Sequence, residues 1–189
     1  MHCRNCPVYS AGAVQLLDAE VPESYLAEQA RHYAQAKTET RPGARSAVIF
    51  RLADEWLALP TTVFREVAPL RKIHSLPHRR DRVVTGVANV RGELLVCVSL
   101  ADALGITGAG AGGTAARLAV VSRDGDRFVF VADEIAELAR YDDADLGPVP
   151  ATLAHAQATY TRGMLAWRDR TVGVLDDQLL FYTLNRSLT

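Results

Sequence analysis

The chain has 189 residues, 49% of them hydrophobic, and 22 acidic against 21 basic side chains give a formal net charge of −1. This length and apolar content allow one folded domain with an extension. The nearly neutral charge argues against nucleic acid as the principal partner. No apolar run approaches the roughly 20 residues of a membrane-spanning helix, and the N-terminus lacks the apolar core of a signal peptide. We therefore expect a cytoplasmic protein without direct membrane insertion.

The first part of the chain has a helical pattern over residues 8–36. Pro22 stands where a helix can begin, and apolar residues after it recur at helical spacing. Residues 37–44 are polar and contain Pro and Gly, which is typical of a linker. The sequence therefore predicts a helical, cysteine-containing extension with its linker over 1–44, followed by a second domain over 45–189.

The second domain has the short apolar runs and turn residues of β structure. Four hairpins are predicted, with strands at 47–52 and 55–59, 83–90 and 93–100, 118–122 and 128–131, and 164–167 and 171–175. Hairpins without long helices between them argue against a parallel α/β sheet and favour small antiparallel barrels or a sandwich. One short helix is expected between Ser99 and Gly105, and another from about Asp176 to the end of the chain.

The segment from Gly86 to Leu100 reads as strand, tight turn and strand. Gly92 suits a turn that requires positive φ. Arg91 is unusual there, because a guanidinium held at a strand corner must find carboxylate or carbonyl partners. Those partners can lie within the chain or on another molecule, and the sequence leaves both roles of Arg91 open.

Two motifs could indicate a cofactor. Gly108–Gly113 contains a literal G-x-G-x-x-G, but the predicted helix precedes it and a strand follows, the reverse of a dinucleotide site. Cys3 and Cys6 form a C-x-x-C beside His2, which supplies at most three ligands where a structural zinc site has four. A redox C-x-x-C normally opens a helix in a βαβ context, which is missing. Cys3 and Cys6 are therefore candidates for an incomplete metal site, and no cofactor is expected.

The other chemistry-bearing residues favour structural interpretations. The basic stretch 71–82 has no aromatic residue for base stacking and is interpreted as a solvated loop. His155 has no evident acid or nucleophile nearby, the acidic stretch 142–145 lacks the Gly and Glu of a calcium loop, and Cys97 is expected to be buried in a strand. Because no G-x-S-x-G, H-E-x-x-H or Walker motif occurs, the sequence predicts a protein that is not an enzyme.

Taken in order, several pieces of the chain from Ser46 to Leu184 resemble the CheW-like domain of bacterial chemosensory systems. The matching pieces are an opening hairpin at Phe50–Pro60, a V-x-E-[IV] strand at Val63–Val67, a G-x-x-N-x-R-G signature at Gly86–Gly92, a V-D-x-V element at Phe130–Ile135, and a C-terminal hairpin at Tyr160–Gly163 and Leu175–Asp176. Ser99 replaces the Asp that often follows the signature, and its hydroxyl can still cap a helix.

The resemblance implies a mainly β fold of two interlocked five-stranded SH3-like barrels, with an N-terminal helical extension and a short C-terminal helix. The implied role is a non-catalytic adaptor, recruited to membrane receptor arrays. It would couple the cytoplasmic tips of methyl-accepting receptors to a CheA-type histidine kinase by binding the kinase's own CheW-like regulatory domain. The implied partner-binding residues are Glu66, Val67, Gly86, Asn89, Arg91, Gly92, Asp133 and Ile135.

The N-terminal segment is similar to the extension of WspD-type coupling proteins, which belong to surface-sensing systems whose output is cyclic di-GMP. In that group the Cys-rich extension usually continues further upstream, so we expect this chain to begin inside the motif. The alternative hypothesis is a metal- or redox-responsive regulator that senses through Cys3 and Cys6.

Overall fold

The structure is a computed structural model that describes residues 6–18, 20–34, 45–77, 82–108, 113–151, 153 and 155–188. The chain divides into two compact units, residues 1–41 and 42–189. The first unit holds two helices, α1 (Pro7–Leu17) and α2 (Glu23–Ala34), and no residue of either helix is buried. The predicted linker at 37–44 lies outside the described residues.

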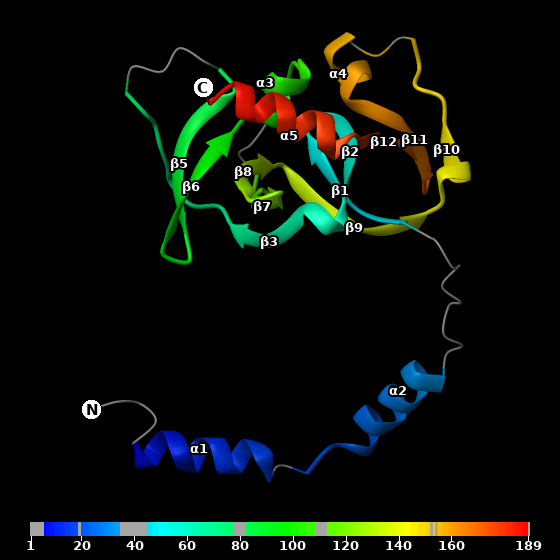
Figure 1. Ribbon diagram of the computed structural model, residues 1–189. Helices are drawn as coiled ribbons and strands as arrows, with labels where there is room; N and C mark the ends of the chain where they lie inside the picture. Colours follow the sequence, from blue (N-terminus) through cyan, green and yellow to red (C-terminus); the bar gives the residue numbers. More distant parts are fainter. Residues whose placement is uncertain are drawn as a thin grey trace. The chain divides into compact units, whose positions relative to one another are not determined.

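The second unit is mainly β (Figure 1). Its strands are β1 (Arg45–Leu52), β2 (Glu55–Pro60), β3 (Phe64–Pro69), β4 (Ile73–His74), β5 (Val84–Val90), β6 (Glu93–Val98), β7 (Arg117–Arg123), β8 (Asp126–Ala132), β9 (Glu134–Tyr141), β10 (Leu146–Gly147), β11 (Thr161–Trp167) and β12 (Arg170–Leu175). Its helices are α3 (Leu100–Leu104), α4 (His155–Tyr160) and α5 (Asp177–Arg186), with short 3-10 turns at Thr61–Val63 and Asp143–Asp145.

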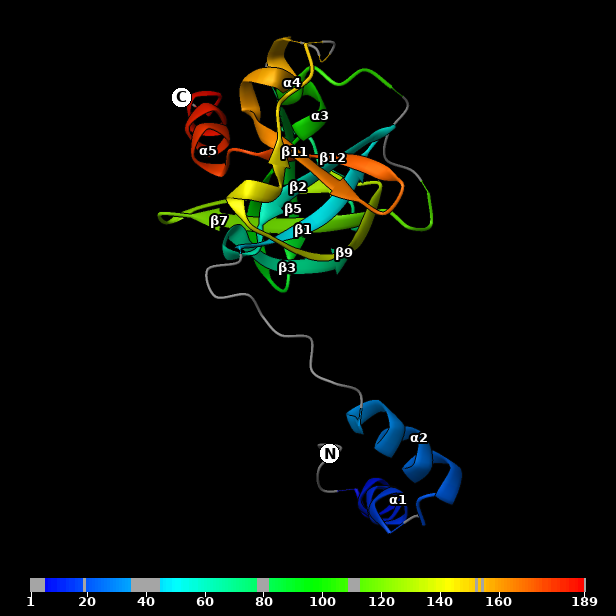
Figure 2. The ribbon, with the colours of Figure 1, turned by 90° about the vertical axis from the view of Figure 1, so that its right-hand side faces the viewer.

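The strands form two sheets (Figures 1 and 2). Sheet A has the order β10-β11-β12-β2-β1-β9, and sheet B has the order β3-β7-β8-β6-β5-β4. In the described part of the chain, each sheet therefore has five long strands and one strand of two residues. The predicted mainly β fold, built on two five-stranded units with helices at both ends of the chain, is confirmed.

The two sheets are interlocked because the chain repeats one arrangement twice. The first half, β1 to β6 with α3, places β1 and β2 in sheet A and its other strands in sheet B. The second half, β7 to β12 with α5, does the reverse. Each strand of the first half has a counterpart six strands further along, so that β1 corresponds to β7 and β6 to β12. When every strand of sheet A is replaced by its counterpart, the result is the order of sheet B read from its other edge. Each half thus contributes one hairpin to the sheet formed mainly by the other half. The β1–β2 hairpin belongs to sheet A, and the β7–β8 hairpin belongs to sheet B.

The exchanged hairpins are buried on both faces. In β7, Ala119 and Val121 join the large central cluster, whereas Leu118 and Val120 face a smaller cluster within sheet B. A strand covered on both faces reads as a continuous apolar run, as the sequence of β7 does. In contrast, β5 and β11 alternate buried and more exposed side chains, as expected for strands with one solvated face.

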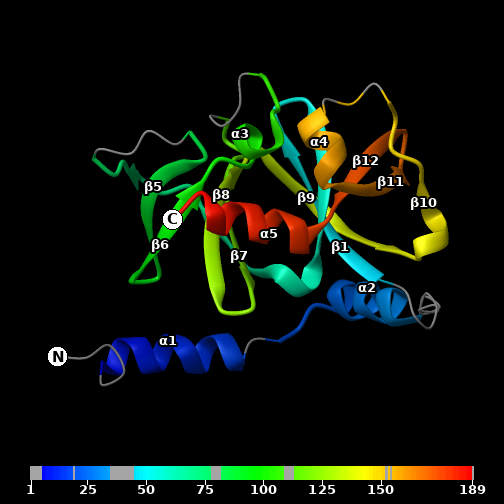
Figure 3. The ribbon, with the colours of Figure 1, turned by 45° about the horizontal axis from the view of Figure 1, so that its top comes forward.

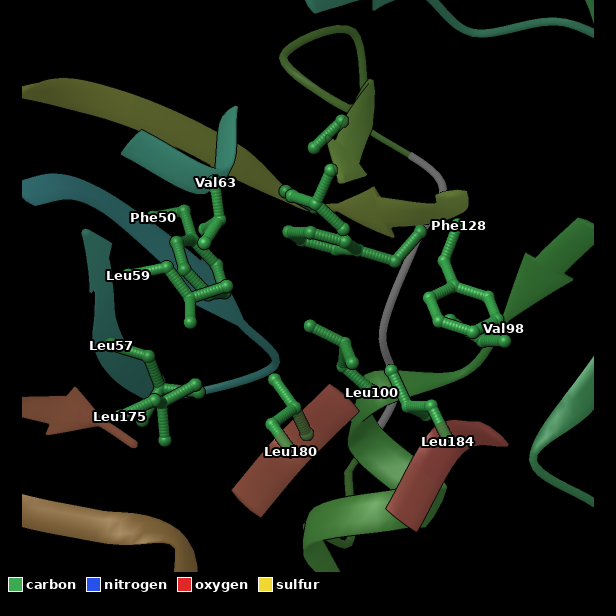
Figure 4. Packing of buried hydrophobic residues seen from close by; sticks show 14 of the residues in the cluster. Phe50, Leu57, Leu59, Val63, Val98, Leu100, Phe128, Leu175, Leu180 and Leu184 are labelled. Atoms are coloured by element: carbon green, nitrogen blue, oxygen red, sulfur yellow. The ribbon is translucent and has the colours of Figure 1, made fainter. Parts of the chain in front are cut away.

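The central cluster lies between the sheets and is closed by helices (Figures 3 and 4). It combines residues of both sheets with residues of α3 and α5, including Phe50, Leu57, Leu59, Val98, Leu100, Phe128, Leu180 and Leu184. Each of these side chains is at most 3% exposed. Burial of this kind contributes roughly 1.5 to 3 kcal/mol for each large apolar side chain. The shared cluster therefore holds the two sheets together as one body.

Local signals in the sequence are confirmed at the turns and caps. The β7–β8 turn has positive φ at both Asp124 (51°) and Gly125 (96°). Ser99 accepts a hydrogen bond from the backbone N–H of Asp102 at 3.1 Å, and Gly105 ends α3 with φ 68°. These pairings follow from side chains and backbone angles within a few residues, which is why the sequence could indicate them.

Three details differ from the sequence prediction. The pairs β12–β2 and β6–β8 are parallel, although the hairpins suggested antiparallel pairing. Strands that pair in parallel are distant along the chain, so no turn residues in the sequence predict their pairing. Arg170 pairs with Trp167 as the first residue of β12, which leaves a turn of only two residues. The basic stretch predicted as a loop contains β4, whose two residues pair with β5.

Candidate functional site

Five of the predicted partner-binding residues gather at one corner of sheet B. We define the Arg91 corner as Glu66, Val67, Asn89, Arg91 and Gly92, which come from β3, the end of β5 and the β5–β6 turn. Arg91 and Gly92 form the turn, with φ of 51° and 91°. The backbone N–H of Gly92 donates to Oδ1 of Asn89 at 2.8 Å. The turn is therefore stabilised by the Asn89 side chain.

An ion pair joins this turn to the edge of the sheet. Nε of Arg91 lies 2.7 Å from Oε1 of Glu66, and Glu66 belongs to β3, at the opposite edge of sheet B from β4. The Arg91 side chain is 79% exposed and that of Glu66 is 23% exposed. The intramolecular role of Arg91 is thus present, and most of the guanidinium is still accessible to solvent.

An exposed apolar side chain follows Glu66 in β3, on the opposite face of the strand. Val67 pairs with Ala119 of β7 in the sheet and is 46% exposed. Leu70, just beyond the end of β3, is also exposed. The Arg91 corner therefore has an exposed guanidinium paired on one face of β3 and an exposed apolar side chain on the other face, and both kinds of residue occur in protein interfaces.

Gly86 has a structural place away from this corner. It is buried, and it has φ 153° at the register shift between β5 and β6. A Cβ atom at Gly86 would lie 2.2 Å from the carbonyl oxygen of His74 in β4. Only glycine allows β4 to approach so closely, so Gly86 shapes the sheet and does not line its surface.

Asp133 and Ile135 also lie apart from the Arg91 corner. Oδ2 of Asp133 accepts a hydrogen bond from the backbone N–H of Ala53 at 2.6 Å, and the backbone N–H of Asp133 donates to the Arg51 carbonyl at 3.0 Å. Asp133 thereby stabilises the β1–β2 turn, where Ala53 has φ 51°. It also lines a cavity of about 300 Å³ together with residues of β5, β6 and α3. Ile135 packs partly against the central cluster.

The second half of the chain repeats the Arg91 arrangement. Arg168 is the first residue of the β11–β12 turn, has φ 54° and pairs with Glu137 of β9 at 2.8 Å. The indole N–H of Trp167 donates to the same carboxylate at 2.5 Å. These contacts, the Trp167 hydrogen bond first and then the Arg168 charge, lower the pKa of Glu137. The sequence contains one signal for this repeat. Gly163 precedes Arg168 by five positions, which is the spacing between Gly86 and Arg91.

The two described cysteines, Cys6 and Cys97, give no support to a metal or redox site. Cys6 precedes α1, is partly exposed and makes no side-chain cap, while Cys3 and His2 lie outside the described residues. Burial raises the pKa of the Cys97 thiol to about 11, as expected for a cysteine packed in a strand. Within the described residues no group of three His, Cys, Asp or Glu side chains is arranged to hold a metal ion.

Two further interpretations concern surface segments. The side chains of Asp142 and Asp145 each accept a hydrogen bond from the backbone N–H of the other residue and so cap the 3-10 turn. Asp143 pairs with Arg45 at 2.8 Å, in agreement with a solvated turn. His155 begins α4, and residues 109–112 of the glycine-rich stretch lie outside the described part. None of the described helices has the length and apolar character required to cross a membrane.

Two interlocked sheets around one shared core, each with an exposed arginine at a hairpin turn, define the fold class of this domain. Residues 46–184 match the family model for the CheW-like domain, and the chain belongs to this family. It is 25% identical to the chemotaxis protein CheW of Rhizobium meliloti (strain 1021) over 140 residues, which cover 74% of this chain and 88% of that protein. The probable chemotaxis protein CheW of Rhizobium etli matches with the same identity and coverage.

A solved structure agrees with the fold. The crystal structure of the scaffolding protein TtCheW from Thermoanaerobacter tengcongensis superposes with a TM-score of 0.64 at 21% identity, covering 78% of this chain and 94% of that one. Together with the family match, this makes the chain a CheW-like scaffold adaptor of chemotaxis signalling. Proteins of this family are not catalytic, so the prediction that the chain is not an enzyme is confirmed.

Proposed function

We propose that the chain couples the cytoplasmic tips of methyl-accepting receptors to a CheA-type histidine kinase, whose CheW-like regulatory domain it binds. The observation that carries this proposal is the Arg91 corner, where Arg91 is held by Glu66 at 2.7 Å and still has most of its surface exposed. A guanidinium fixed in this way loses little conformational freedom when it binds a partner. Exposed Val67, the residue after Glu66 on the opposite face of β3, supplies apolar contact area.

The single core suits this role. An adaptor without catalytic activity acts by fixing the distance and angle between the proteins that it binds. The central cluster contains side chains from both sheets and from α3 and α5. Close-packed interiors of this kind have low compressibility, so the core should keep the two sheets in a fixed relative position. We place the adaptor in the cytoplasm, at membrane receptor arrays.

Binding measurements with matched variants test the coupling role. The probes are the purified CheW-like regulatory domain of the kinase and a fragment of the receptor tip. Arg91→Ala should weaken binding to at least one of them, while changing the free energy of unfolding by no more than about 1 kcal/mol, because exposed ion pairs contribute little. Arg127→Ala removes a comparable exposed ion pair with Glu93 on the same sheet and serves as the control.

Two results would count against this role. If the unaltered chain binds neither probe, the coupling function is wrong. If Arg91→Ala and Arg127→Ala weaken binding equally, or if Arg91→Ala unfolds the domain, direct contact through Arg91 is wrong.

We further propose that the array belongs to a surface-sensing system whose output is cyclic di-GMP. The support is the likeness of the N-terminal segment to the extension of WspD-type coupling proteins. A strain that lacks this gene should fail to raise cyclic di-GMP on contact with a surface and should still swim up chemical gradients. The opposite pattern, with normal cyclic di-GMP and lost chemotaxis in liquid, would assign the chain to a swimming system.

A further inference from the structure

Both tryptophans of the chain lie at one end of sheet A. Trp56 of β2 and Trp167 of β11 have ring centroids 5.1 Å apart and an interplanar angle of 48°. Three arginines stand over these rings. The guanidinium carbon of Arg168 lies 4.6 Å from the ring centroid of Trp167, and those of Arg170 and Arg51 lie 5.3 and 5.9 Å from that of Trp56.

These side chains surround an open hollow of about 410 Å³. We define the tryptophan hollow by its lining residues, which are Arg51, Trp56, Glu134, Ile135, Ala136, Trp167, Arg168, Asp169 and Arg170. It lies on sheet A, whereas the Arg91 corner belongs to sheet B. Of the predicted partner-binding residues only Ile135 lines it, and the coupling function proposed above is argued from the Arg91 corner.

The internal repeat shows what is special about this hollow. Trp56 is the second residue of β2, as Arg127 is the second residue of β8, and Arg170 opens β12 as Glu93 opens β6. In sheet B, Nη1 of Arg127 contacts both carboxylate oxygens of Glu93, at 2.5 and 2.6 Å. The same two positions in sheet A hold an indole and a guanidinium. One half of the domain therefore has a closed ion pair where the other half has a cation over an aromatic face.

The three arginines around the hollow differ in how closely they contact acceptor groups within the chain. Arg51 donates to the Ala53 carbonyl at 2.6 Å and lies 3.4 Å from Glu134. Arg168 is paired with Glu137, which also accepts from Trp167. Among the described residues, the acidic partner of Arg170 is Asp169 of the adjacent turn, at a long distance of 3.9 Å, and the Asp169 side chain is 86% exposed. Such a pair contributes little in water, so the Arg170 guanidinium has donors to offer to another acceptor.

We propose that the tryptophan hollow binds an acidic side chain in a peptide segment of a partner protein. The carboxylate would accept hydrogen bonds from Arg170, which the Trp56 ring holds in position, and the methylene groups would pack on the indole faces. Arginine on an aromatic face is well oriented for a carboxylate, and Trp and Arg are the residues most enriched where interfaces bind tightly. The volume of the hollow suits one or two side chains.

Tryptophan fluorescence offers a direct test, because the chain contains two tryptophans and both line the hollow. The probe is the blocked peptide acetyl-Glu-Leu-Glu-Leu-Glu-amide, and its control is the same peptide with Gln in place of each Glu. The acidic peptide should change the emission saturably, and the Gln peptide should bind at least about tenfold more weakly, as expected when a charge-assisted hydrogen bond is lost.

Variants of the full chain separate charge recognition from loss of the fold. Arg170→Gln and Arg170→Glu should abolish the saturable change. The double variant Trp56→Arg with Arg170→Glu copies the ion pair of sheet B into sheet A, and should remain folded without binding the peptide. Arg127→Gln, at the equivalent site of sheet B, should bind it as the unaltered chain does. Circular dichroism verifies the fold of each protein.

Four results would overturn the proposal: no saturable change with the acidic peptide, equal affinity for the Gln peptide, unaltered binding by a folded Arg170 variant, or equally tight competition by inorganic phosphate. The last would indicate a site for small anions. Because the test involves neither kinase nor receptor, its failure would leave the coupling function standing.

Discussion

Arg91 and Arg168 occupy the same position in the two halves of the domain. Each is the first residue of a two-residue hairpin turn, with φ of 51° and 54°, and each pairs with a glutamate on an edge strand of its own sheet. A non-glycine residue at such a φ costs roughly 1 to 2 kcal/mol. Ala53 and Asp124 have the same φ of 51° in the other two hairpin turns, so this backbone angle follows from the turn type, and what Arg91 and Arg168 share beyond it is the pairing with an edge-strand glutamate.

Replacing Gly86 should be far more damaging than replacing Gly92. In Gly86→Ala the new Cβ would lie 2.2 Å from the backbone oxygen of His74, so β4 must move away. We expect a loss of about 2 to 4 kcal/mol in the free energy of unfolding, measured with urea. Gly92→Ala is the control, since it meets only backbone strain at φ 91° with nothing within 4 Å. Equal losses would show that β4 does not pack as described.

Asp133 should prove to be structural through its acceptor oxygen. Asp133→Ala leaves the backbone N–H of Ala53 without the acceptor that now lies at 2.6 Å, which should cost about 1 to 3 kcal/mol of stability. Asp133→Asn keeps a side-chain oxygen and should lose much less. If both variants are as stable as the unaltered chain, the residue does not stabilise the β1–β2 turn, and the expected contact with a partner would be its better explanation.

The Glu137 contacts should contribute stability that depends on pH. The Trp167 hydrogen bond and the Arg168 charge lower the pKa of Glu137 below its ordinary value of 4.5. A group with a lowered pKa contributes its full stabilisation above the ordinary value and loses it as the pH falls through the lowered one. The stability difference between the unaltered chain and Glu137→Gln should therefore be constant near neutrality and shrink below about pH 4.5. A difference that grows on acidification would contradict the described contacts.

The Cys97 thiol should be unreactive in the folded protein. Burial raises its pKa to about 11, so almost no thiolate exists at pH 8. In a Cys3→Ser and Cys6→Ser background, a disulfide reagent should modify Cys97 only after the domain unfolds. Modification at the rate of an exposed cysteine, with the fold intact by circular dichroism, would disagree with the packing of β6.

The sequence predicted what depends on neighbouring residues and missed what depends on distant ones. The Asp124–Gly125 turn and the Ser99 cap are local, and both are confirmed. The pairing of Arg91 with Glu66 depends on the curl of sheet B, so the sequence could only leave the role of Arg91 open. The contact between Trp56 and Trp167 depends on the parallel pairing of β2 with β12, and no turn residues in the sequence predict that pairing.

The exchanged hairpins have a consequence for how such a domain can be assembled. Each sheet is completed only by a hairpin from the other half of the chain. Two separate polypeptides, each with the strands of one half, could close the same core by swapping hairpins across a two-fold axis. The domain is therefore built as a domain-swapped homodimer would be, with the link from α3 to β7 as the tether that fuses its subunits.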